Sequence, residues 1–465
     1  MKVVLVGHGL PPELVGGTEG SVECEARMLA ARGDDVCIVA GTLSTADSES
    51  ELVEPASGRR VRVVRLARTD LYSDHWHKTL APAVTRGVRR VLREFAPDVV
   101  HVHHWIRLSR DLVLAAAREG VAAVVSLHDA WTGCPIAFRV ETSTLSSCSA
   151  PVGPHPCLAC AARVGPRTRW VKREQEFMLL AERQRDLARE LELARALLVP
   201  TAAHRGELER VGVLRAGDPR VAVLAPRPAA TALELGAANG RATSRREPRD
   251  EGRLVLGVLG HLMPHKGQEL VLAAVARLAG RVDIEVRFAG ADADPTFARA
   301  LRERAPTDRV RFLGAYERAS LAAHPVADVH AWVSASRAKE SFGLLLDEAR
   351  ALGLATVLAD HGAFAERGRD GGSLLFAPGD DASLAAALER LAIEPGLWSS
   401  LGAQARSLAD ARESADAWCA CVRETLLAAA GLGAPVVPPE EWFAARMAQE
   451  FLDSWDRGVR GGGIA

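Results

Sequence analysis

A segment in the second half of the chain places two glutamates on either side of a glycine at the expected start of a helix. Glu340 and Glu348 are separated by seven residues that include Ser341-Phe342-Gly343-Leu344. Gly343 allows backbone N–H groups to approach a ligand closely, and a helix N-terminus carries partial positive charge that suits phosphate. Glu348 interrupts an apolar helical stripe and therefore needs a polar partner. We expect a phosphate-bearing ligand here. The structural alternative is a helix-start charge at Glu340 and a buried salt bridge at Glu348.

Two loops at other strand ends carry groups suited to anions. The loop Gly260–Gly267 follows an apolar run and contains His261 and Lys266. A lysine there can pair with a diphosphate oxygen. Gly16 and Gly17 lie in a glycine-rich loop after the first apolar run, without the spacing of a dinucleotide fingerprint or a P-loop. Each loop taken alone is also compatible with an ordinary turn.

Histidines mark the strand ends of the first half. His101 and His103 share one face of an expected strand end, and His128 directly follows the run Ala122–Leu127. From that position His128 can hydrogen-bond a sugar hydroxyl or stabilise developing charge. The alternative is a structural histidine whose ring nitrogens are satisfied within the fold.

These residues need a scaffold in which strands end side by side. Short apolar runs alternate with helical stretches in both halves of the chain. This alternation is typical of α/β proteins with doubly wound parallel sheets, whose ligands bind beyond the carboxyl ends of the strands. We expect strands over Lys2–Val6, Asp35–Ala40, Val61–Leu66, Asp98–Val102, Ala122–Leu127, Ala194–Pro200, Arg220–Leu224, Leu254–Leu259, Val282–Ala289, Val310–Leu313, Val329–Ser334 and Ala355–Leu358.

The alternation is interrupted once, which divides the chain into two Rossmann-like domains facing a central cleft. We place the N-terminal domain at 1–228, a linker or mobile loop at 229–252 and the second domain at 253–432. Aromatic residues of the tail 433–465 repeat at helical spacing. The tail is therefore expected to form a helix that returns to the N-terminal domain.

Composition bounds the class of protein. The 465 residues are 48% hydrophobic and 25% charged with a formal net charge of −1, which excludes a disordered chain and argues against nucleic acid as a partner. No secretory signal or membrane-spanning run is visible, so we expect a cytoplasmic protein. Arginines within 86–93 and 163–173 leave peripheral contact with an anionic membrane open, beside the alternative of solvated helix faces.

Four of the eight cysteines cluster in an insertion at about 131–165. Cys134, Cys148, Cys157 and Cys160 lie among glycines and prolines. Four thiolates can close a tetrahedral structural zinc site, which would rigidify a segment without a core of its own. The alternatives are an iron–sulfur cluster, a redox-active Cys-x-x-Cys pair and four reduced bystanders.

Taken jointly, these features resemble the retaining glycosyltransferases of family GT4 (glycosyltransferase group 1), which have the GT-B fold. The resemblance covers nearly the whole chain. It rests on Gly16–Glu19, Pro97–His103, His128-Asp129, Lys266-Gly267, Glu340–Glu348 and a glycine-containing segment that ends at Glu366. It implies an enzyme of the hexosyltransferase type that transfers a sugar from a nucleotide-diphosphate sugar to an unidentified glycan, lipid-linked or small-molecule acceptor. Catalysis in the family usually needs no metal.

The resemblance also implies roles for individual residues. Glu340, His128 and Lys266 would be catalytic, with Glu340 at the donor sugar and His128 facing the transferred group. The donor would be bound by Glu348 at the ribose, by Lys266 and the backbone of Phe342, Gly343 and Leu344 at the diphosphate, by His261, and by Gly16 and Gly17 near the phosphates. His261 is a departure, because the family usually has a permanently charged arginine at its position.

Two other functions remain open at this point. A sugar-nucleotide epimerase on the same fold would convert its substrate without an acceptor, although the two glutamates argue against it. A non-catalytic module that binds nucleotide-sugars would follow if the change to His261 had removed turnover. The fold alone does not decide between them, because the same fold can carry different activities.

Overall fold

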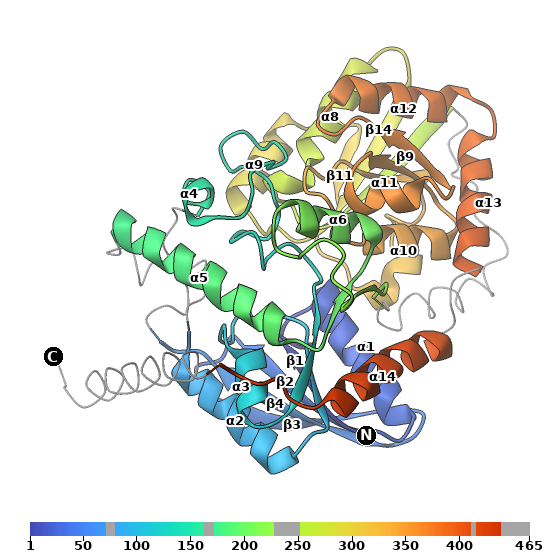
Figure 1. Cartoon of the computed structure of the whole chain (residues 1–465). Coiled ribbons are helices and arrows are strands. Elements are labelled where there is room, and N and C mark those ends of the chain that lie inside the picture. The colour runs from blue at the N-terminus through green and yellow to red at the C-terminus, as the bar shows by residue number, and fades with distance from the viewer. Residues whose placement is uncertain (71–79, 162–171, 227–251, 411–414, 439–465) are drawn as a thin grey trace.

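Two parallel sheets, one in each half of the chain, organise the protein (Figure 1). The computed structural model describes residues 1–70, 80–161, 172–226, 252–410 and 415–438. Apolar residues on both faces of each sheet pack against helices. The predicted α/β class with two doubly wound domains is confirmed.

The first sheet has eight strands in the order β3-β4-β2-β1-β5-β6-β7-β8. Neighbouring strands pair in parallel except for β3, which pairs antiparallel with β4 at the edge. The strands are β1 (Lys2–Gly7), β2 (Asp35–Thr42), β3 (Ser48–Val53), β4 (Arg60–Ala67), β5 (Val99–Val102), β6 (Ala122–Ser126), β7 (Ala196–Val199) and β8 (Val221–Val223).

Successive residues of the central strand β1 pack on opposite faces of this sheet. Val3 and Leu5 contact the apolar side of α1, whereas Val4 and Val6 belong to the core beneath α2, α3 and α5. Burial on both faces explains the continuous apolar sequence of the strand. The helices of this half are α1 (Gly17–Ala31), α2 (Pro82–Phe95), α3 (Leu112–Arg118), α4 (Pro154–Cys157), α5 (Arg173–Leu193) and α6 (Ala202–Arg210).

The second sheet has six parallel strands in the order β11-β10-β9-β12-β13-β14. Helices α8, α9 and α12 cover one face and α10 packs on the other. The strands are β9 (Arg253–Leu259), β10 (Asp283–Ala289), β11 (Val310–Phe312), β12 (Ala331–Ser334), β13 (Ala355–Ala359) and β14 (Ser373–Phe376). The helices are η2 (Pro264–Lys266), α8 (Gln268–Arg277), α9 (Pro295–Arg304), η3 (Arg318–Ala323), α10 (Leu344–Leu352), α11 (Gly362–Gly368), α12 (Asp381–Ile393) and α13 (Leu397–Asp410).

All the predicted strands form, and their ends shift by at most two residues. Two strands, β3 and β14, were not predicted. The sequence of β3 alternates serine with glutamate and is mostly exposed, so it lacks an apolar signal. It pairs at the edge through its backbone and through cross-strand ion pairs such as Glu49 with Arg62.

Helix α14 (Ala415–Leu432) returns to the N-terminal domain earlier in the chain than we predicted. Trp418, Val422 and Leu426 pack into the core beneath α1, and Arg423 bonds to Asp34 at 2.8 Å. In Figure 1, α14 lies beside α1 at the first domain. The second domain therefore ends before α14 rather than at residue 432. The predicted tail helix falls largely on 439–465, outside the described residues.

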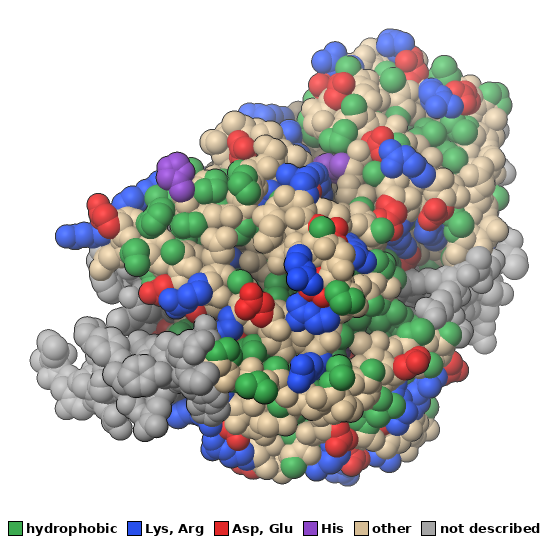
Figure 2. Space-filling model, in the orientation of Figure 1, with side chains coloured by type: hydrophobic (Ala, Val, Ile, Leu, Met, Phe, Trp, Pro, Cys, Tyr) green, Lys and Arg blue, Asp and Glu red, His purple; other side chains and the backbone are tan. Residues whose placement is uncertain are grey.

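The predicted linker 229–252 also falls outside the described residues, except for its last position. Within the described segments, no helix has the length and apolarity needed to cross a bilayer. On the face shown in Figure 2, basic and acidic side chains are interspersed. Part of the arginine set on α2 is paired, since Arg89 and Arg93 both bond to Glu119. Peripheral membrane contact stays a prediction.

Candidate active site

The loops that follow β9 and β12 bring a lysine and a glutamate together. Lys266 Nζ donates a hydrogen bond to Glu340 Oε1 at 2.8 Å, and Ser336 Oγ donates to the same oxygen at 3.0 Å. Burial raises the pKa of Glu340, but the charge and hydrogen bond of Lys266, together with the hydrogen bond from Ser336, lower it below its ordinary value, so the carboxylate is ionised at neutral pH. Two predicted site residues from separate loops therefore form one ion pair, and this pairing was not predicted. Ser336 was not predicted either.

Helix α10 begins directly after this ion pair. Its N-cap Gly343 has φ 78°, the left-handed region, and a Cβ there would lie 2.4 Å from the Phe364 ring. The chain therefore requires glycine at the tip of α10. The first N–H groups of a helix have no intrahelical partner, so this tip offers donors and partial positive charge beside Lys266.

Side chains behind the tip fix its position. Arg367 Nη1 donates to the carbonyl oxygen of Phe342 at 2.8 Å, and its guanidinium lies 3.9 Å from the centre of the Phe342 ring. Arg367 also pairs with Asp347.

Glu348 is 5% exposed, so the carboxylate predicted to interrupt an apolar stripe is buried. His261 is exposed in the loop after β9, and its carbonyl accepts a bond from Gln268 at 2.9 Å.

The two domains meet at the loop that leads into α10. Ser341 Oγ donates to the carbonyl oxygen of His128 at 2.5 Å, and Thr201 Oγ1 donates to the carbonyl oxygen of Ser341 at 2.7 Å. A Cβ on Gly17 would lie 2.9 Å from Leu344 Cδ1, so the glycine-rich loop touches the first residue of α10. Residues predicted from both halves thus lie at one seam, at the carboxyl ends of both sheets.

His128 belongs to a row of histidines at the strand ends of the first domain. Its Nε2 lies 2.9 Å from Nδ1 of His103, and the two rings are stacked. Burial lowers the pKa of His128 to about 3, so the ring is neutral at pH 7. A neutral imidazole can donate one hydrogen bond and accept another, but it does not supply positive charge.

The first turn of α1 holds a carboxylate that the sequence analysis did not assign to the site. Glu19 pairs with His8 Nε2 at 3.0 Å, and a Cβ on Gly16 would lie 2.5 Å from Glu19 Oε2. Burial raises the pKa of Glu19, but the hydrogen bond and charge of His8 lower it to about 2. Negative charge at a helix N-terminus is itself favourable. Gly16 leaves room for this pair.

The cysteine-rich insertion reaches the second domain. Phe138 stacks on His265 with ring centres 3.7 Å apart, and buried Arg139 holds the segment by donating to the carbonyl of Ala150 at 2.6 Å. The four cysteines are free thiols. Within the described residues they do not bring three ligand atoms within 4.8 Å of one another. Zinc binding by Cys134, Cys148, Cys157 and Cys160 stays a prediction.

Each half of the chain matches a family model. Residues 15–222 match Glycosyltransferase Family 4, and residues 253–394 match Glycosyl transferases group 1. D-inositol 3-phosphate glycosyltransferase from Actinosynnema mirum is 29% identical over 84% of this chain and 87% of its own. Phosphatidyl-myo-inositol mannosyltransferase from Mycolicibacterium smegmatis is 39% identical, but the match spans 30% of this chain and 36% of that protein.

Solved structures share the two-domain architecture. Sucrose-phosphate synthase from Thermosynechococcus elongatus aligns with a TM-score of 0.66 at 17% identity, covering 91% of this chain and 97% of that one. HepE from Anabaena, solved with UDP-glucose, aligns with a TM-score of 0.57 at 18% identity over 92% of this chain and all of the other. At such identities the likeness concerns the fold.

Proposed function

The chain belongs to the family 4, group 1 glycosyltransferases with the GT-B fold, and from this premise we propose that it moves a hexose from a nucleotide-diphosphate sugar to an acceptor with retention of the anomeric configuration. The observation that carries the proposal is the meeting of Lys266, Glu340 and the tip of α10 at the seam with His128 and Gly17. Relatives named as sugar transferases favour transfer over epimerisation.

In the proposed reaction the bond between the anomeric carbon and the diphosphate breaks, and a bond to the acceptor oxygen forms on the same face. The acceptor proton passes to a phosphate oxygen of the leaving group. Lys266 and the N–H groups at the tip of α10 would stabilise the negative charge that develops on the diphosphate. Glu340 would hold Lys266 in position and contact the donor sugar, while neutral His128 would hydrogen-bond the transferred sugar.

A donor screen followed by product analysis tests this proposal. The purified full-length protein is titrated with UDP-, GDP- and ADP-sugars, and UDP-glucose is the first probe because HepE was solved with it. The donor that binds is then incubated with candidate acceptors, among them D-inositol 3-phosphate, which relatives are named for. We expect a product heavier by one hexose, whose anomeric proton coupling matches that of the donor.

Other results would contradict specific parts of the proposal. Inversion at the anomeric carbon would overturn retention. Conversion of the donor to an epimer without an acceptor would favour the epimerase. Tight donor binding without donor consumption, across hydrolysis and transfer assays, would favour the non-catalytic module.

Replacing Glu348 is expected to weaken donor binding selectively. If its carboxylate accepts hydrogen bonds from the ribose hydroxyls, Glu348→Gln should raise the donor Kd about 10- to 100-fold, since bonds to a charged group contribute about 1.5–3 kcal/mol. Isothermal titration with the donor and with the free nucleotide measures this effect, which should be similar for both. Glu303→Gln, at an exposed glutamate on α9 in the same domain, is the matched control and should leave the Kd unchanged. An unchanged Kd for Glu348→Gln would remove it from the ribose site.

A further inference from the structure

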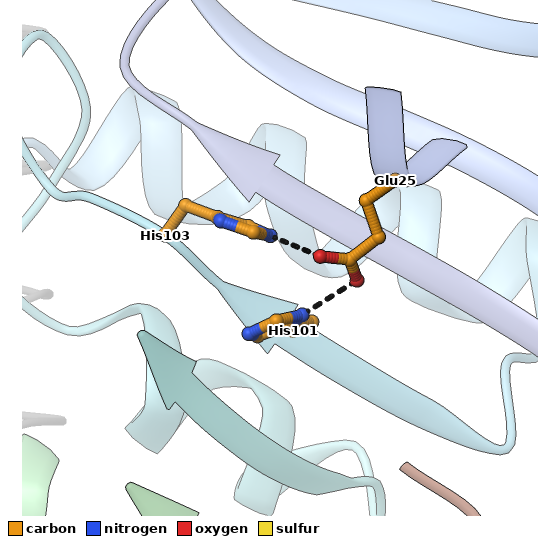
Figure 3. A group of neighbouring side chains, drawn as sticks. All are labelled: Glu25, His101 and His103. Atoms are coloured by element: carbon orange, nitrogen blue, oxygen red, sulfur yellow. Dashed lines mark hydrogen bonds and ion pairs between the residues drawn. The ribbon is translucent and has the colours of Figure 1, made fainter. Parts of the chain in front are cut away.

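A carboxylate and two imidazoles meet inside the first domain, in the row of histidines that also contains His128 (Figure 3). Glu25 lies on the buried face of α1, among Val22, Ala26 and Leu29, and is 2% exposed. His101 lies on β5 and His103 directly after it. An ionisable carboxylate in an apolar helical stripe needs compensating charge or hydrogen bonds to remain buried.

The three side chains aim their polar atoms at one point. His101 Nδ1 lies 2.7 Å from Glu25 Oε1, and His103 Nε2 lies 3.4 Å from Glu25 Oε2. In Figure 3 both rings point their nitrogens at the carboxylate. One ligand atom from each residue falls within 4.8 Å of the others, the only such group of three among the residues that the structure describes.

One of these atoms has unmet hydrogen-bonding capacity. His103 is 2% exposed, and its Nε2 makes no hydrogen bond among the described residues; its 3.4 Å contact with Glu25 Oε2 is a loose ion pair. A buried polar nitrogen without a partner is costly and calls for an explanation such as a bound ion or water. A cavity of about 20 Å³ borders the group and is lined by Glu25, His101 and His103. That volume accommodates about one water molecule.

The far nitrogen of each imidazole has a partner of its own. His101 Nε2 lies 2.8 Å from Ser126 Oγ, and His103 Nδ1 lies 2.9 Å from His128 Nε2. Histidines that ligate metals characteristically use one nitrogen for the ion and the other for a hydrogen bond that fixes the ring. Both histidines therefore have the second-nitrogen contacts that a metal site requires.

We propose that Glu25, His101 and His103 bind a divalent transition-metal ion, with zinc the best match, and that a water molecule in the adjoining cavity completes the coordination. Two imidazoles and one carboxylate suit zinc and its neighbours rather than magnesium or calcium, which prefer oxygen ligands. Ligand atoms around a tetrahedral zinc lie roughly 3.4 Å apart, since the bonds are about 2.1 Å. The separation of 2.7 Å between His101 Nδ1 and Glu25 Oε1 is shorter than this and would widen when the ion binds, whereas the 3.4 Å between His103 Nε2 and Glu25 Oε2 already matches it.

The ion would also set the proton position on His128, a consequence that rests on the proposed function. When Nε2 of His103 is bound to the metal, the proton of its neutral ring must lie on Nδ1. This Nδ1–H then donates a hydrogen bond to Nε2 of His128. His128 would then carry its own proton on Nδ1. His103 is in this sense a positioning residue for His128.

Metal analysis of the full-length protein tests the site without any sugar nucleotide, so its outcome is independent of the proposed function. The protein is stripped with a chelator, dialysed, and titrated with Zn²⁺ and separately with Co²⁺. We expect visible d–d absorption of a four-coordinate Co²⁺ ion, and in Cys157→Ser, in which an ion held by the cysteine-rich insertion would be lost, this absorption should appear without a thiolate charge-transfer band. Glu25→Gln should weaken Co²⁺ binding at this site about 100-fold or more, because even outer-sphere changes cost about 10- to 100-fold.

Two further variants make the result decisive. Cys157→Ser is the control for the cysteine-rich insertion and should leave the d–d absorption of the Glu25, His101 and His103 site unchanged. His103→Asn removes the Nε2 ligand but retains an amide near the Nδ1 position, so it should also lose the ion, and it serves if Glu25→Gln fails to fold. The proposal is overturned if the wild-type protein binds no ion with this spectrum, or if folded Glu25→Gln or His103→Asn binds it as tightly as the wild type.

Discussion

Lys266→Met is expected to lower the transfer rate constant about 100- to 1000-fold while changing the donor KM far less. Removing one preorganised group that stabilises developing charge typically costs this much. The diphosphate is more negative in the transition state than in the bound donor, so the lysine contributes more to catalysis than to binding. Methionine matches the lysine side chain through Cε, so the change is confined mainly to the loss of the ammonium group. Steady-state kinetics with the donor from the screen measure both constants.

The same variant should alter the pH dependence of the residual activity. In the wild type, burial raises the pKa of Glu340, and Lys266 together with Ser336 brings it below its ordinary value. Without the ammonium, burial remains and the pKa of Glu340 rises. Because the active form of Glu340 is ionised, the acidic limb of the rate profile should move to higher pH in Lys266→Met. An unshifted limb would mean that Glu340 does not titrate in the reaction.

A second lysine near the seam provides the matched control. Lys339 pairs with Glu207 at 2.9 Å and so joins the two domains, but it carries no role in the proposed reaction. Lys339→Met should change the rate constant by less than about 5-fold, since a partly exposed ion pair contributes about 1 kcal/mol or less. Equal losses in both variants would show that seam contacts in general, rather than the cation at Lys266, control activity.

The sequence was sufficient to predict which loops contribute residues to the site, because these loops follow the ends of predicted strands. The alternation of apolar runs and helices located β9 and β12, and their following loops contain Lys266 and Glu340. Glycine at 343 was informative because the left-handed backbone at the tip of α10 excludes other residues. Local patterns sufficed here, because each of these features depends on neighbours close in the chain.

Pairings between distant segments could not be predicted. Glu25 and His101 are 76 residues apart in sequence and meet only because α1 packs on β1, the strand beside β5. Glu25 also occupies a position where an apolar residue would be expected, and that interruption of the stripe was the one available signal. The hydrogen bond from Ser341 to the His128 carbonyl likewise depends on the relative placement of two domains.

The chain returns to the first domain at α14, ahead of the predicted tail helix, which lies largely outside the described residues. In α14, small residues and leucines follow Trp418, so this helix lacks the aromatic spacing of 433–465. Alanine-rich sequence is compatible with both buried and exposed helices, so the pattern did not show which domain α14 contacts. The position of α14 follows from the core beneath α1, because the face of the first sheet that carries Val3 and Leu5 needs apolar cover, which α14 provides.

Trp418→Ala is therefore expected to destabilise the N-terminal domain by about 3–5 kcal/mol, the usual cost of truncating a large buried aromatic side chain. Trp418 is 6% exposed, packs in the core that contains Val3 and Leu5, and donates from Nε1 to the carbonyl of Ala225 at 2.8 Å. Urea unfolding followed by circular dichroism measures the loss. The transition of the first domain should shift, whereas that of the second should not.

Leu427→Ala on the same helix separates burial from helix propensity. Leu427 is 43% exposed, and leucine and alanine both favour helices, so this change should cost less than about 0.5 kcal/mol. If Trp418→Ala cost no more than this control, α14 would not be part of the first domain's core. If instead both unfolding transitions shifted together, the domains would unfold as one unit, because the chain passes between them both before β9 and before α14. That result would tie the geometry of the seam, and with it the proposed donor site, to the docking of α14.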